Sequence, residues 1–302
     1  MTTSTSPHPE GRPSSPCETP SFFVDGQFAE AFDRLGLISL DAVFAFDSGR
    51  DLVKLNIGRF RRRVQFEAIP AGRREPVKVF LKRYDHPPIL GQIRNWLSRG
   101  RRRSFASLER EAIESLAAAG VGVPRIVAFG EEYGPLFERR SFLMTEEIHN
   151  SQSLERRLPD CFSDPATPIV LGTRRDFIRR LAEFIQRFHA TGRRHRDLYL
   201  CHIFCSDAGE FHLIDLARAS RPLLQRRFQI KDLAQLHYSS PARHFSRTDR
   251  MRFCLAYVGR VRLLPEDKTL IRAVLRKTAS MARHNVKHGA VPPFLERTEG
   301  GC

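Results

Sequence analysis

Polar residues near the middle of the chain have the types and spacing of a phosphoryl-transfer site. His195, Arg196 and Asp197 are consecutive, His202 follows Asp197 by five positions, and Asp215 follows it by eighteen. A hydroxyl that attacks a phosphoryl group needs a carboxylate to orient it and accept its proton, and Asp197 suits that role. A magnesium ion on nucleotide phosphates needs hard oxygen ligands, so Asp215 is the main metal-ligand candidate and His202 the second.

The elements expected around these residues are those of a kinase catalytic segment. An apolar stripe predicts a helix that ends at Gly192 and is formed by Phe177, Leu181, Phe184, Ile185 and Phe188. Residues 203–205 and 210–214 predict a hairpin, and Asp215 ends its second strand. A lone His-Arg-Asp would equally fit a surface ion pair. The preceding helix and the following hairpin favour a catalytic loop and a metal-binding aspartate.

A kinase site also needs a strand lysine that contacts the phosphates. Residues 77–84 alternate in a way that predicts a strand with Lys78, Phe80 and Lys82 on one face. Only 7 of the 50 basic residues are lysines, so arginine would be expected at a merely solvated position. We therefore choose Lys82 as the phosphate contact, with Lys78 as the alternative. An ordinary edge-strand lysine is the competing interpretation.

The glutamate that would pair with this lysine is expected on a helix over residues 104–119. The apolar stripe of that helix consists of Leu108, Ala112, Leu116 and Ala119. At 100° per residue, Glu111 and Glu109 border opposite sides of this stripe, and Glu114 points away from it. We choose Glu111, because it can face inward while its neighbours pack.

Two further residues could support the site. The sequence has no glycine-rich G-x-G-x-x-G loop, and Gly58, directly before the basic run 59–63, is the remaining candidate. Main-chain or arginine contacts would then have to cradle the phosphates. Asp232 has two interpretations, which stay open here: a buried carboxylate that holds the catalytic loop, or a helix N-terminal residue stabilised by the helix dipole.

The composition limits the class of protein. The chain has 302 residues, a net charge of +16 and 41% hydrophobic residues, which is enough for a packed core. It has no apolar run long enough to span a membrane. Residues 1–20 predict a disordered tail without the apolar segment of a secretory signal. We expect a sheet-rich N-terminal lobe at 21–147, a helix-rich C-terminal lobe at 148–290 and a short tail at 291–302.

Three motifs in the C-terminal half resemble those of the lipopolysaccharide kinase (Kdo/WaaP) family. They are HRDLYLCH at 195–202, LIDLARA at 213–219 and KDLAQLHYSS at 231–240. Upstream, the segments that fall at the family's lysine, helix glutamate and inter-lobe hinge are 80–82, 110–111 and 145–147. The resemblance covers residues 45–285, and the C-terminal motifs are its most specific part.

The resemblance implies an α+β, protein-kinase-like fold with two lobes, of which the helical C-lobe is reduced. It implies ATP and Mg²⁺ as cofactors and a sugar hydroxyl of the lipopolysaccharide inner core, on heptose or Kdo, as the acceptor. Asp197 would be the base, and Asp215 and His202 would lie at the metal. Lys82 would pair with Glu111. The nucleotide would lie near Gly58, Glu146 and Glu147, and the structural residues would be His195 and Asp232. The segment between Asp215 and Asp232 is too short for a protein-kinase activation loop and lacks A-P-E, which favours a small or glycan acceptor.

The positive charge suggests an anionic partner. Residues 85–103 predict a basic, irregular stretch with Trp96 and four arginines, namely Arg99, Arg101, Arg102 and Arg103. We expect these arginines to attract a glycolipid or the anionic cytoplasmic face of the inner membrane, to which a cytoplasmic enzyme would bind peripherally. The alternatives are a kinase-fold binding module without activity and a kinase of another small molecule or of protein. Nucleic-acid binding is disfavoured, because no recognisable module accompanies the charge.

Overall fold

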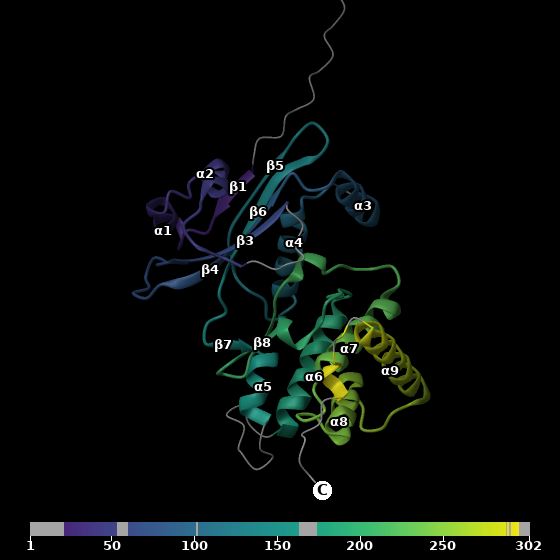
Figure 1. Cartoon of the computed structure of the whole chain (residues 1–302). Coiled ribbons are helices and arrows are strands. Elements are labelled where there is room, and N and C mark those ends of the chain that lie inside the picture. The colour runs from purple at the N-terminus through teal and green to yellow at the C-terminus, as the bar shows by residue number, and fades with distance from the viewer. Residues whose placement is uncertain are drawn as a thin grey trace, which may run out of the picture.

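The structure is a computed structural model that describes residues 21–52, 60–100, 102–162, 174–287, 289 and 291–295. An antiparallel sheet with its helices forms one half, and a mainly helical half lies below it (Figure 1). Across the described residues, no helix is long and apolar enough to cross a membrane.

The N-terminal half is built on a six-stranded antiparallel sheet in the order β1-β5-β6-β4-β3-β2. The strands are β1 (Ser21–Val24), β2 (Arg50–Asp51), β3 (Arg61–Ala68), β4 (Val77–Asp85), β5 (Ile126–Tyr133) and β6 (Glu138–Glu146). The predicted strand with Lys78 and Lys82 is confirmed as β4. Val79 and Leu81 on its opposite face are fully buried, so the two-residue period of the strand sends the lysines to the other side.

Four helices accompany this sheet. They are α1 (Ala29–Arg34), α2 (Leu40–Ala45), α3 (Ile89–Arg99) and α4 (Phe105–Ala118). The predicted helix over 104–119 is confirmed as α4, and the Ser104 hydroxyl caps it by accepting from Ser107 N at 3.0 Å. The prediction of an irregular stretch over 85–103 is wrong, because Ile89–Arg99 form α3. The apolar side chains of this helix are exposed, so its helical period does not appear as a buried stripe.

Among its described residues, the C-terminal half combines a small sheet with five helices. Its strands, in sheet order, are β7 (Ser151–Ser153), β8 (Ile203–Ser206) and β9 (Phe211–Leu213). Its helices are α5 (Leu154–Phe162), α6 (Arg174–Ala190), α7 (Gln225–Ser239), α8 (Arg247–Val258) and α9 (Pro265–Val286), with 3₁₀ turns η1 (Leu200–His202), η2 (Leu216–Arg218) and η3 (Pro293–Leu295). The predicted helix before Gly192 and the 203–214 hairpin are confirmed as α6 and β8-β9.

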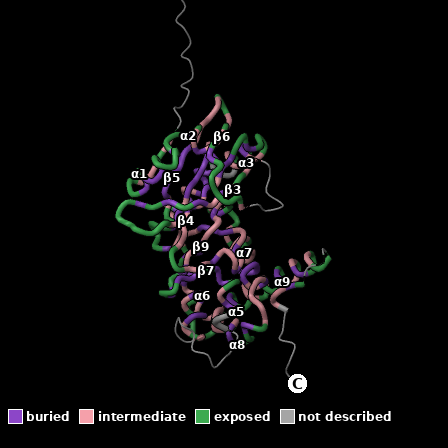
Figure 2. The backbone as a smooth tube through the Cα atoms, turned by 60° about the vertical axis from the view of Figure 1, so that its left-hand side comes forward, coloured by how far each residue is buried: buried purple, intermediate pink, exposed green. Residues whose placement is uncertain are grey.

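Helix α4 connects the packing of the two halves. One buried cluster covers the sheet side that faces α1 and α2, as with Phe32 and Phe66. The other joins α4 residues such as Leu116 to α6 residues such as Phe188, and the buried backbone runs through both halves in Figure 2. The lobe boundaries at 147/148 and 290/291 stay a prediction.

Glu138 at the start of β6 ties α3 and α4 to the sheet. Its carboxylate accepts from Phe105 N at 2.9 Å and from the Ser141 hydroxyl at 2.5 Å, while its own N–H donates to Gln92 Oε1 at 2.8 Å. Burial raises the pKa of Glu138 to about 7, more than these hydrogen bonds lower it.

This carboxyl should make stability fall as pH rises. A free glutamate has a pKa of 4.5, so the unfolded chain loses its proton first, and stability is lost between about pH 4.5 and 7. Glu138→Gln, which cannot ionise, should remove up to about 3 kcal/mol of that loss. Urea denaturation of both proteins between about pH 4.5 and 7 measures the difference in unfolding free energy. If the unfolding free energies of the two proteins changed with pH in the same way, Glu138 would not be the group that titrates.

Candidate active site

Asp232 holds the backbone of the His195–Asp197 loop. Its buried carboxylate accepts from His195 N and from Arg196 N, both at 2.7 Å, and Arg196 has a left-handed φ of 73°. The Arg196 carbonyl in turn accepts from Lys231 Nζ at 2.7 Å and from Gln235 Nε2 at 3.1 Å. Because α7 begins at Gln225, Asp232 lies inside the helix, so the helix-start alternative is wrong and the loop-holding one is confirmed.

Removing this carboxylate should destabilise the fold. In Asp232→Ala two buried N–H groups lose their acceptor, which should lower the unfolding free energy by about 3 kcal/mol. Asp207→Ala is the matched control, since the Asp207 side chain is 70% exposed and pairs with Arg157, and its loss should cost less than about 1 kcal/mol. Urea denaturation of both variants measures their unfolding free energies. Equal losses in the two variants would show that the Asp232 hydrogen bonds stabilise the fold no more than the Asp207 ion pair does.

Two histidines connect this loop to Asp215. Burial lowers the pKa of His195, and its Nε2 donates to the Ile214 carbonyl at 3.0 Å, so the neutral ring braces the residue before Asp215. His202 Nδ1 lies 2.7 Å from the Asp197 carbonyl, which can only accept, so we assign the proton to Nδ1. The other nitrogen, Nε2, then presents its lone pair 4.0 Å from Asp215 Oδ2.

The proposed base Asp197 is held by an arginine from the segment after Asp215. Arg218 Nη1 donates to both carboxylate oxygens of Asp197, at 3.0 and 2.8 Å. The Asp197 side chain keeps 26% of its surface exposed and that of Arg218 keeps 55%. The carboxylate is therefore oriented yet accessible to an acceptor hydroxyl.

Lys82 pairs with Glu109, which corrects the choice of Glu111. Lys82 Nζ lies 2.5 Å from Glu109 Oε1 and 3.3 Å from Asp215 Oδ1, and the Glu109 side chain is 98% buried. Glu111 instead forms an ion pair with Arg103. The apolar stripe chosen from the sequence omitted Ile113. With Ile113 included, the buried face of α4 is centred on Glu109, because the residues three, four and seven positions later are Ala112, Ile113 and Leu116.

Two arginines of β3, missed in the sequence, complete the surroundings of Asp215. Arg63 Nη2 donates to both its carboxylate oxygens, at 3.0 and 3.1 Å, and Arg61 Nη2 lies 3.4 Å away. Burial alone would raise the pKa of Asp215, but the charges of Lys82, Arg63 and Arg61 together lower it well below its usual range. Their spacing of two places both on one face of a strand, but the register that pairs Arg63 with Lys82 is set by the fold.

A cavity of about 760 Å³ between the two halves is lined by Arg63, Lys82, Glu109, His202 and Asp215. Apolar side chains on its walls include Phe80, Ile113, Ile148, Phe204 and Leu216. The hinge residues Glu146 and Glu147 also line it, but their carboxylates pair with Arg73 at 2.6 Å and with Lys78 at 3.2 Å. Gly58 lies outside the described residues. The cavity thus has an apolar part suited to a base and a cationic part suited to phosphates.

The residues present fit a nucleotide-bound Mg²⁺ in its usual protein setting. Within the described ranges, no group of three or more His, Cys, Asp or Glu residues could hold a metal. Magnesium is commonly held by one or two carboxylates together with substrate phosphates. Asp215 supplies the carboxylate, and the lone pair of His202 Nε2 faces the same point.

The four arginines expected to attract a membrane have different surroundings. Arg102 lies over the Tyr133 ring at 4.2 Å and donates to the Gly134 carbonyl at 3.1 Å. Arg103 is neutralised by Glu111. The side chain of Arg99 and all of Arg101 lie outside the described residues. Two of the four charges are thus used within the protein.

The site geometry can now be set beside known proteins. The sequence model of the lipopolysaccharide kinase (Kdo/WaaP) family matches residues 61–257, which include the Lys82, Asp197 and Asp215 positions. The chain belongs to the lipopolysaccharide kinase (Kdo/WaaP) family. The predicted family is thereby confirmed.

Three similar curated proteins are each named lipopolysaccharide core heptose(I) kinase WaaP. The one from Pseudomonas aeruginosa is 29% identical over 212 residues, 67% of this chain and 73% of its own. That from Escherichia coli K12 is 31% identical over 188 residues, 60% of this chain and 70% of its own. A further Escherichia coli protein is 33% identical over 205 residues, 65% of this chain and 74% of its own.

A solved structure of a Kdo/WaaP family member supports the fold. It is described as WaaP in complex with acyl carrier protein and is 25% identical to this chain, with a TM-score of 0.63. The likeness covers 86% of this chain and 99% of that one. The predicted kinase-like fold of a sheet-rich N-terminal half and a helical C-terminal half is confirmed.

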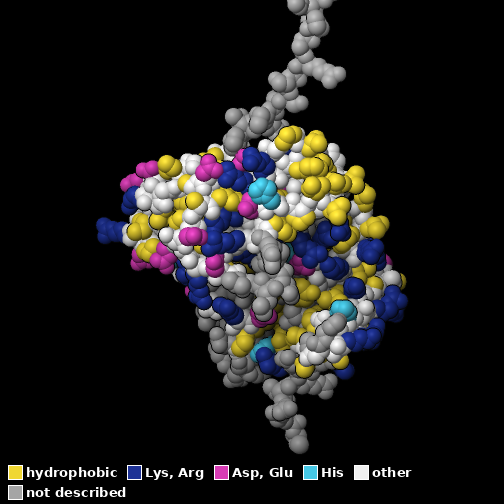
Figure 3. Space-filling view, turned by 45° about the horizontal axis from the view of Figure 1, so that its top comes forward, with side chains coloured by type: hydrophobic (Ala, Val, Ile, Leu, Met, Phe, Trp, Pro, Cys, Tyr) yellow, Lys and Arg dark blue, Asp and Glu magenta, His cyan; other side chains and the backbone are white. Residues whose placement is uncertain are grey.

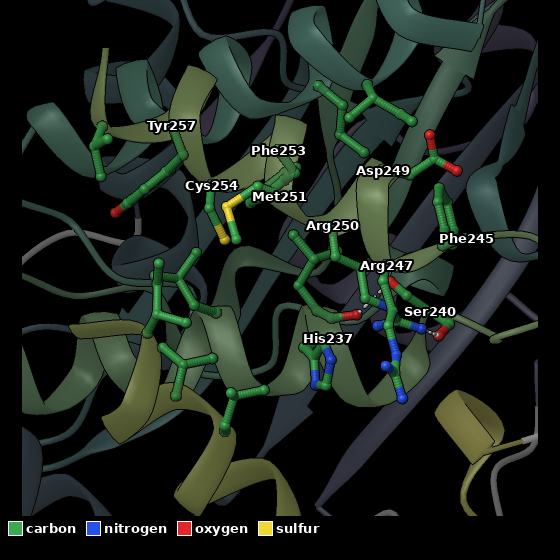
Figure 4. Close-up of a pocket in the computed structure, with 18 of the residues that line it drawn as sticks. His237, Ser240, Phe245, Arg247, Asp249, Arg250, Met251, Phe253, Cys254 and Tyr257 are labelled. Atoms are coloured by element: carbon green, nitrogen blue, oxygen red, sulfur yellow. Dashed lines mark hydrogen bonds between the residues drawn. The ribbon is translucent and has the colours of Figure 1, made fainter. Parts of the chain in front are cut away.

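A second cavity, of about 290 Å³, lies among α6, α7, α8 and α9 of this family member. Its walls are mainly apolar and include Leu181, Leu233, Leu236, Tyr257, Leu270 and Val274. Figure 4 shows its polar end, where Arg250 donates to the Ser240 carbonyl at 3.0 Å near His237. It shares no lining residue with the cavity around Asp215, so it suits a separate apolar ligand.

Proposed function

We propose that this protein is an ATP-dependent kinase that phosphorylates a heptose or Kdo hydroxyl of the lipopolysaccharide inner core. The observation that carries the proposal is a cavity lined by Lys82, Glu109 and Asp215, beside the loop that holds Asp197 and His202, in a member of the lipopolysaccharide kinase family. The relatives' acceptor, named as core heptose, is the best guide to the sugar.

Each residue has a part that follows from its position. Lys82, fixed by Glu109, would bind the phosphates of ATP, and Asp215 with His202 would hold Mg²⁺. The bound metal would supply positive charge to the transferring phosphoryl group. Asp197 would orient the sugar hydroxyl and take its proton. Arg61 and Arg63 would contribute the phosphate contacts that a glycine-rich loop makes elsewhere, with Glu146 and Glu147 bordering the base.

A binding module without kinase activity is the competing function. The missing glycine-rich loop and the histidine at position 202 motivate it. Against it stands the contact of Lys82 with both Glu109 and Asp215, with Asp197 in the loop that also positions His202. A chain that no longer transferred phosphate would have no reason to keep a buried lysine–glutamate pair at the price of desolvation.

A panel of acceptors tests the proposed substrate class. Purified protein with Mg²⁺ and γ-labelled ATP should label inner-core oligosaccharide, and should leave protein, duplex DNA and free hexoses unlabelled. Mass spectrometry of the labelled fragment identifies the sugar. Preferential labelling of protein or of a small metabolite would replace the acceptor, while keeping the kinase assignment.

We also propose that the protein works at the cytoplasmic face of the inner membrane, where a core glycolipid would be met. Its net charge of +16 favours an anionic surface. Arg102 and Arg103 would contribute less to this attraction than an unpaired arginine, because their charges have partners in the protein.

A second binding function is favoured by the solved relative that is complexed with acyl carrier protein. We propose that this chain also binds an acyl carrier protein, with the acyl chain in the apolar cavity among α6–α9. A long-chain acyl carrier protein should raise the melting temperature, and Val274→Phe, which fills the cavity, should abolish that rise. Val261→Phe, at a fully exposed position, is the control. Equal shifts in both variants would place the binding elsewhere.

A further inference from the structure

Helix α3 turns its apolar side toward solvent. Leu90 and Leu97 are each 82% exposed, Ile89 is 53% exposed and Ile93 is 37% exposed. At 100° per residue these four side chains occupy one face of the helix. A helix on a globular protein normally buries such a face, so this one is left without a partner among the described residues.

Contacts on the adjoining side of α3 fix this orientation. Gln92 is buried and donates to the Pro87 and Glu138 carbonyls, at 2.9 and 3.3 Å, while its Oε1 accepts from Glu138 N. The Trp96 ring stacks on Phe137 with centroids 5.3 Å apart. The helix therefore cannot roll to bury its leucines without losing buried hydrogen bonds, which costs more than their exposure.

A second exposed apolar group lies in the loop between η2 and α7. Leu223 is fully exposed and Leu224 is 59% exposed, and the exposed arginines around them are Arg221, Arg226 and Arg227. Figure 1 places this loop below α3 on the same side of the molecule. In Figure 3 a broad hydrophobic area borders groups of Lys and Arg side chains.

This surface adjoins the acceptor side of the proposed active site. Arg218, which holds Asp197, lies in η2 directly before the loop. Burial lowers the pKa of Arg196, and the neighbouring charges of Arg218 and of Arg94 on α3 lower it further. Arg94 of α3 and Arg218 of η2 therefore both lie near Arg196, the residue before Asp197, so cations border the acceptor side of the proposed site.

We propose that the apolar face of α3 and the Leu223-Leu224 pair form a docking surface for an anionic lipid bilayer. In this orientation the Asp197 carboxylate lies on the side of the protein that faces the lipid. Protruding leucines among arginines suit the headgroup boundary, where the side chains enter the acyl region and the cations meet phosphate. A second copy fits less well. A symmetric pair would bring Arg94, Arg221 and Arg226 of both copies together, and none of the described residues 89–97 and 221–227 is acidic to offset them.

Vesicle flotation of the full chain tests this proposal. The wild type should float with phosphatidylcholine vesicles that contain phosphatidylglycerol, and weakly with phosphatidylcholine alone. The variant Leu90→Ser/Leu97→Ser/Leu223→Ser/Leu224→Ser should partition at least about tenfold less, with an unchanged melting temperature. The control Ile38→Ser/Val261→Ser removes exposed apolar groups elsewhere and should float as the wild type does.

The orientation of this surface rests on the proposed kinase function, but vesicle flotation and phosphate transfer test the two separately. Unchanged flotation of the quadruple variant would overturn the docking surface. So would a wild-type dimer in size-exclusion chromatography that the variant loses while still floating. If the quadruple variant lost acyl-carrier-protein binding but still floated, the surface would bind a protein and not a membrane. With a soluble, delipidated acceptor the quadruple variant should keep wild-type turnover. If the wild type floated but transferred no phosphate, the proposed kinase function would be wrong and the docking surface would remain supported.

Discussion

Asp197→Asn should lower the turnover number for sugar phosphorylation by about 10³-fold or more while leaving the fold and ATP binding intact. The amide keeps the shape of the side chain and can still accept from Arg218, but it can no longer take a proton from the acceptor hydroxyl. Initial rates with Mg·ATP and inner-core acceptor measure the loss, and a nucleotide-induced thermal shift measures binding.

The control for this variant is Asp207→Asn, which changes a turn aspartate whose carboxylate accepts from Arg157 Nη2. It should keep wild-type turnover. A drop of less than about tenfold in Asp197→Asn would mean that another group accepts the proton. A drop accompanied by loss of the thermal shift would mean that Asp197 supports nucleotide binding instead.

Glu109→Gln and Glu111→Gln should differ strongly in activity, although they lie on the same helix. Glu109→Gln removes the buried counter-charge 2.5 Å from Lys82 and should lower kcat/KM for ATP by about 10²-fold. Glu111→Gln removes a charge that pairs with Arg103 rather than with Lys82, and this variant should stay within about twofold of the wild type. Steady-state kinetics at varied ATP compares them.

The reverse ranking would restore the glutamate chosen from the sequence and contradict the contacts of Lys82. Glu109→Gln also leaves Lys82 beside Asp215, so a stability measurement accompanies the kinetics. A melting temperature within a few degrees of the wild type would assign the kinetic loss to the site. Combining Glu109→Gln with Lys82→Met should cost little more than either change alone, because the two residues act as one unit.

The parts of the site that the sequence predicts are those carried by neighbouring residues. His195 to Asp215 lie in one loop and one hairpin, where chain order almost determines proximity, and the expected strand with Lys82 follows from simple alternation. Asp232 required a choice between two roles, because helix length could not be judged from a short motif. The structure decides it by starting α7 seven residues earlier.

The parts that the sequence does not predict depend on tertiary packing. Whether Glu109 or Glu111 faces Lys82 depends on how α4 is rotated against the sheet, and one omitted apolar residue changed that answer. Arg61 and Arg63 reach Asp215 across more than 150 positions of sequence, a pairing that no local pattern encodes. Helix α3 was missed because its apolar face is exposed, whereas the patterns used assume a buried one.

Phosphate transfer to purified inner-core oligosaccharide is the most direct test of the central claim. The full chain is incubated with Mg²⁺, γ-labelled ATP and the oligosaccharide, and mass spectrometry locates any added phosphate. We predict one phosphate on a heptose or Kdo hydroxyl, which is absent with Asp197→Asn. A protein that binds Mg·ATP in a thermal-shift assay and yet transfers phosphate to no acceptor would contradict the account and make this fold a binding module.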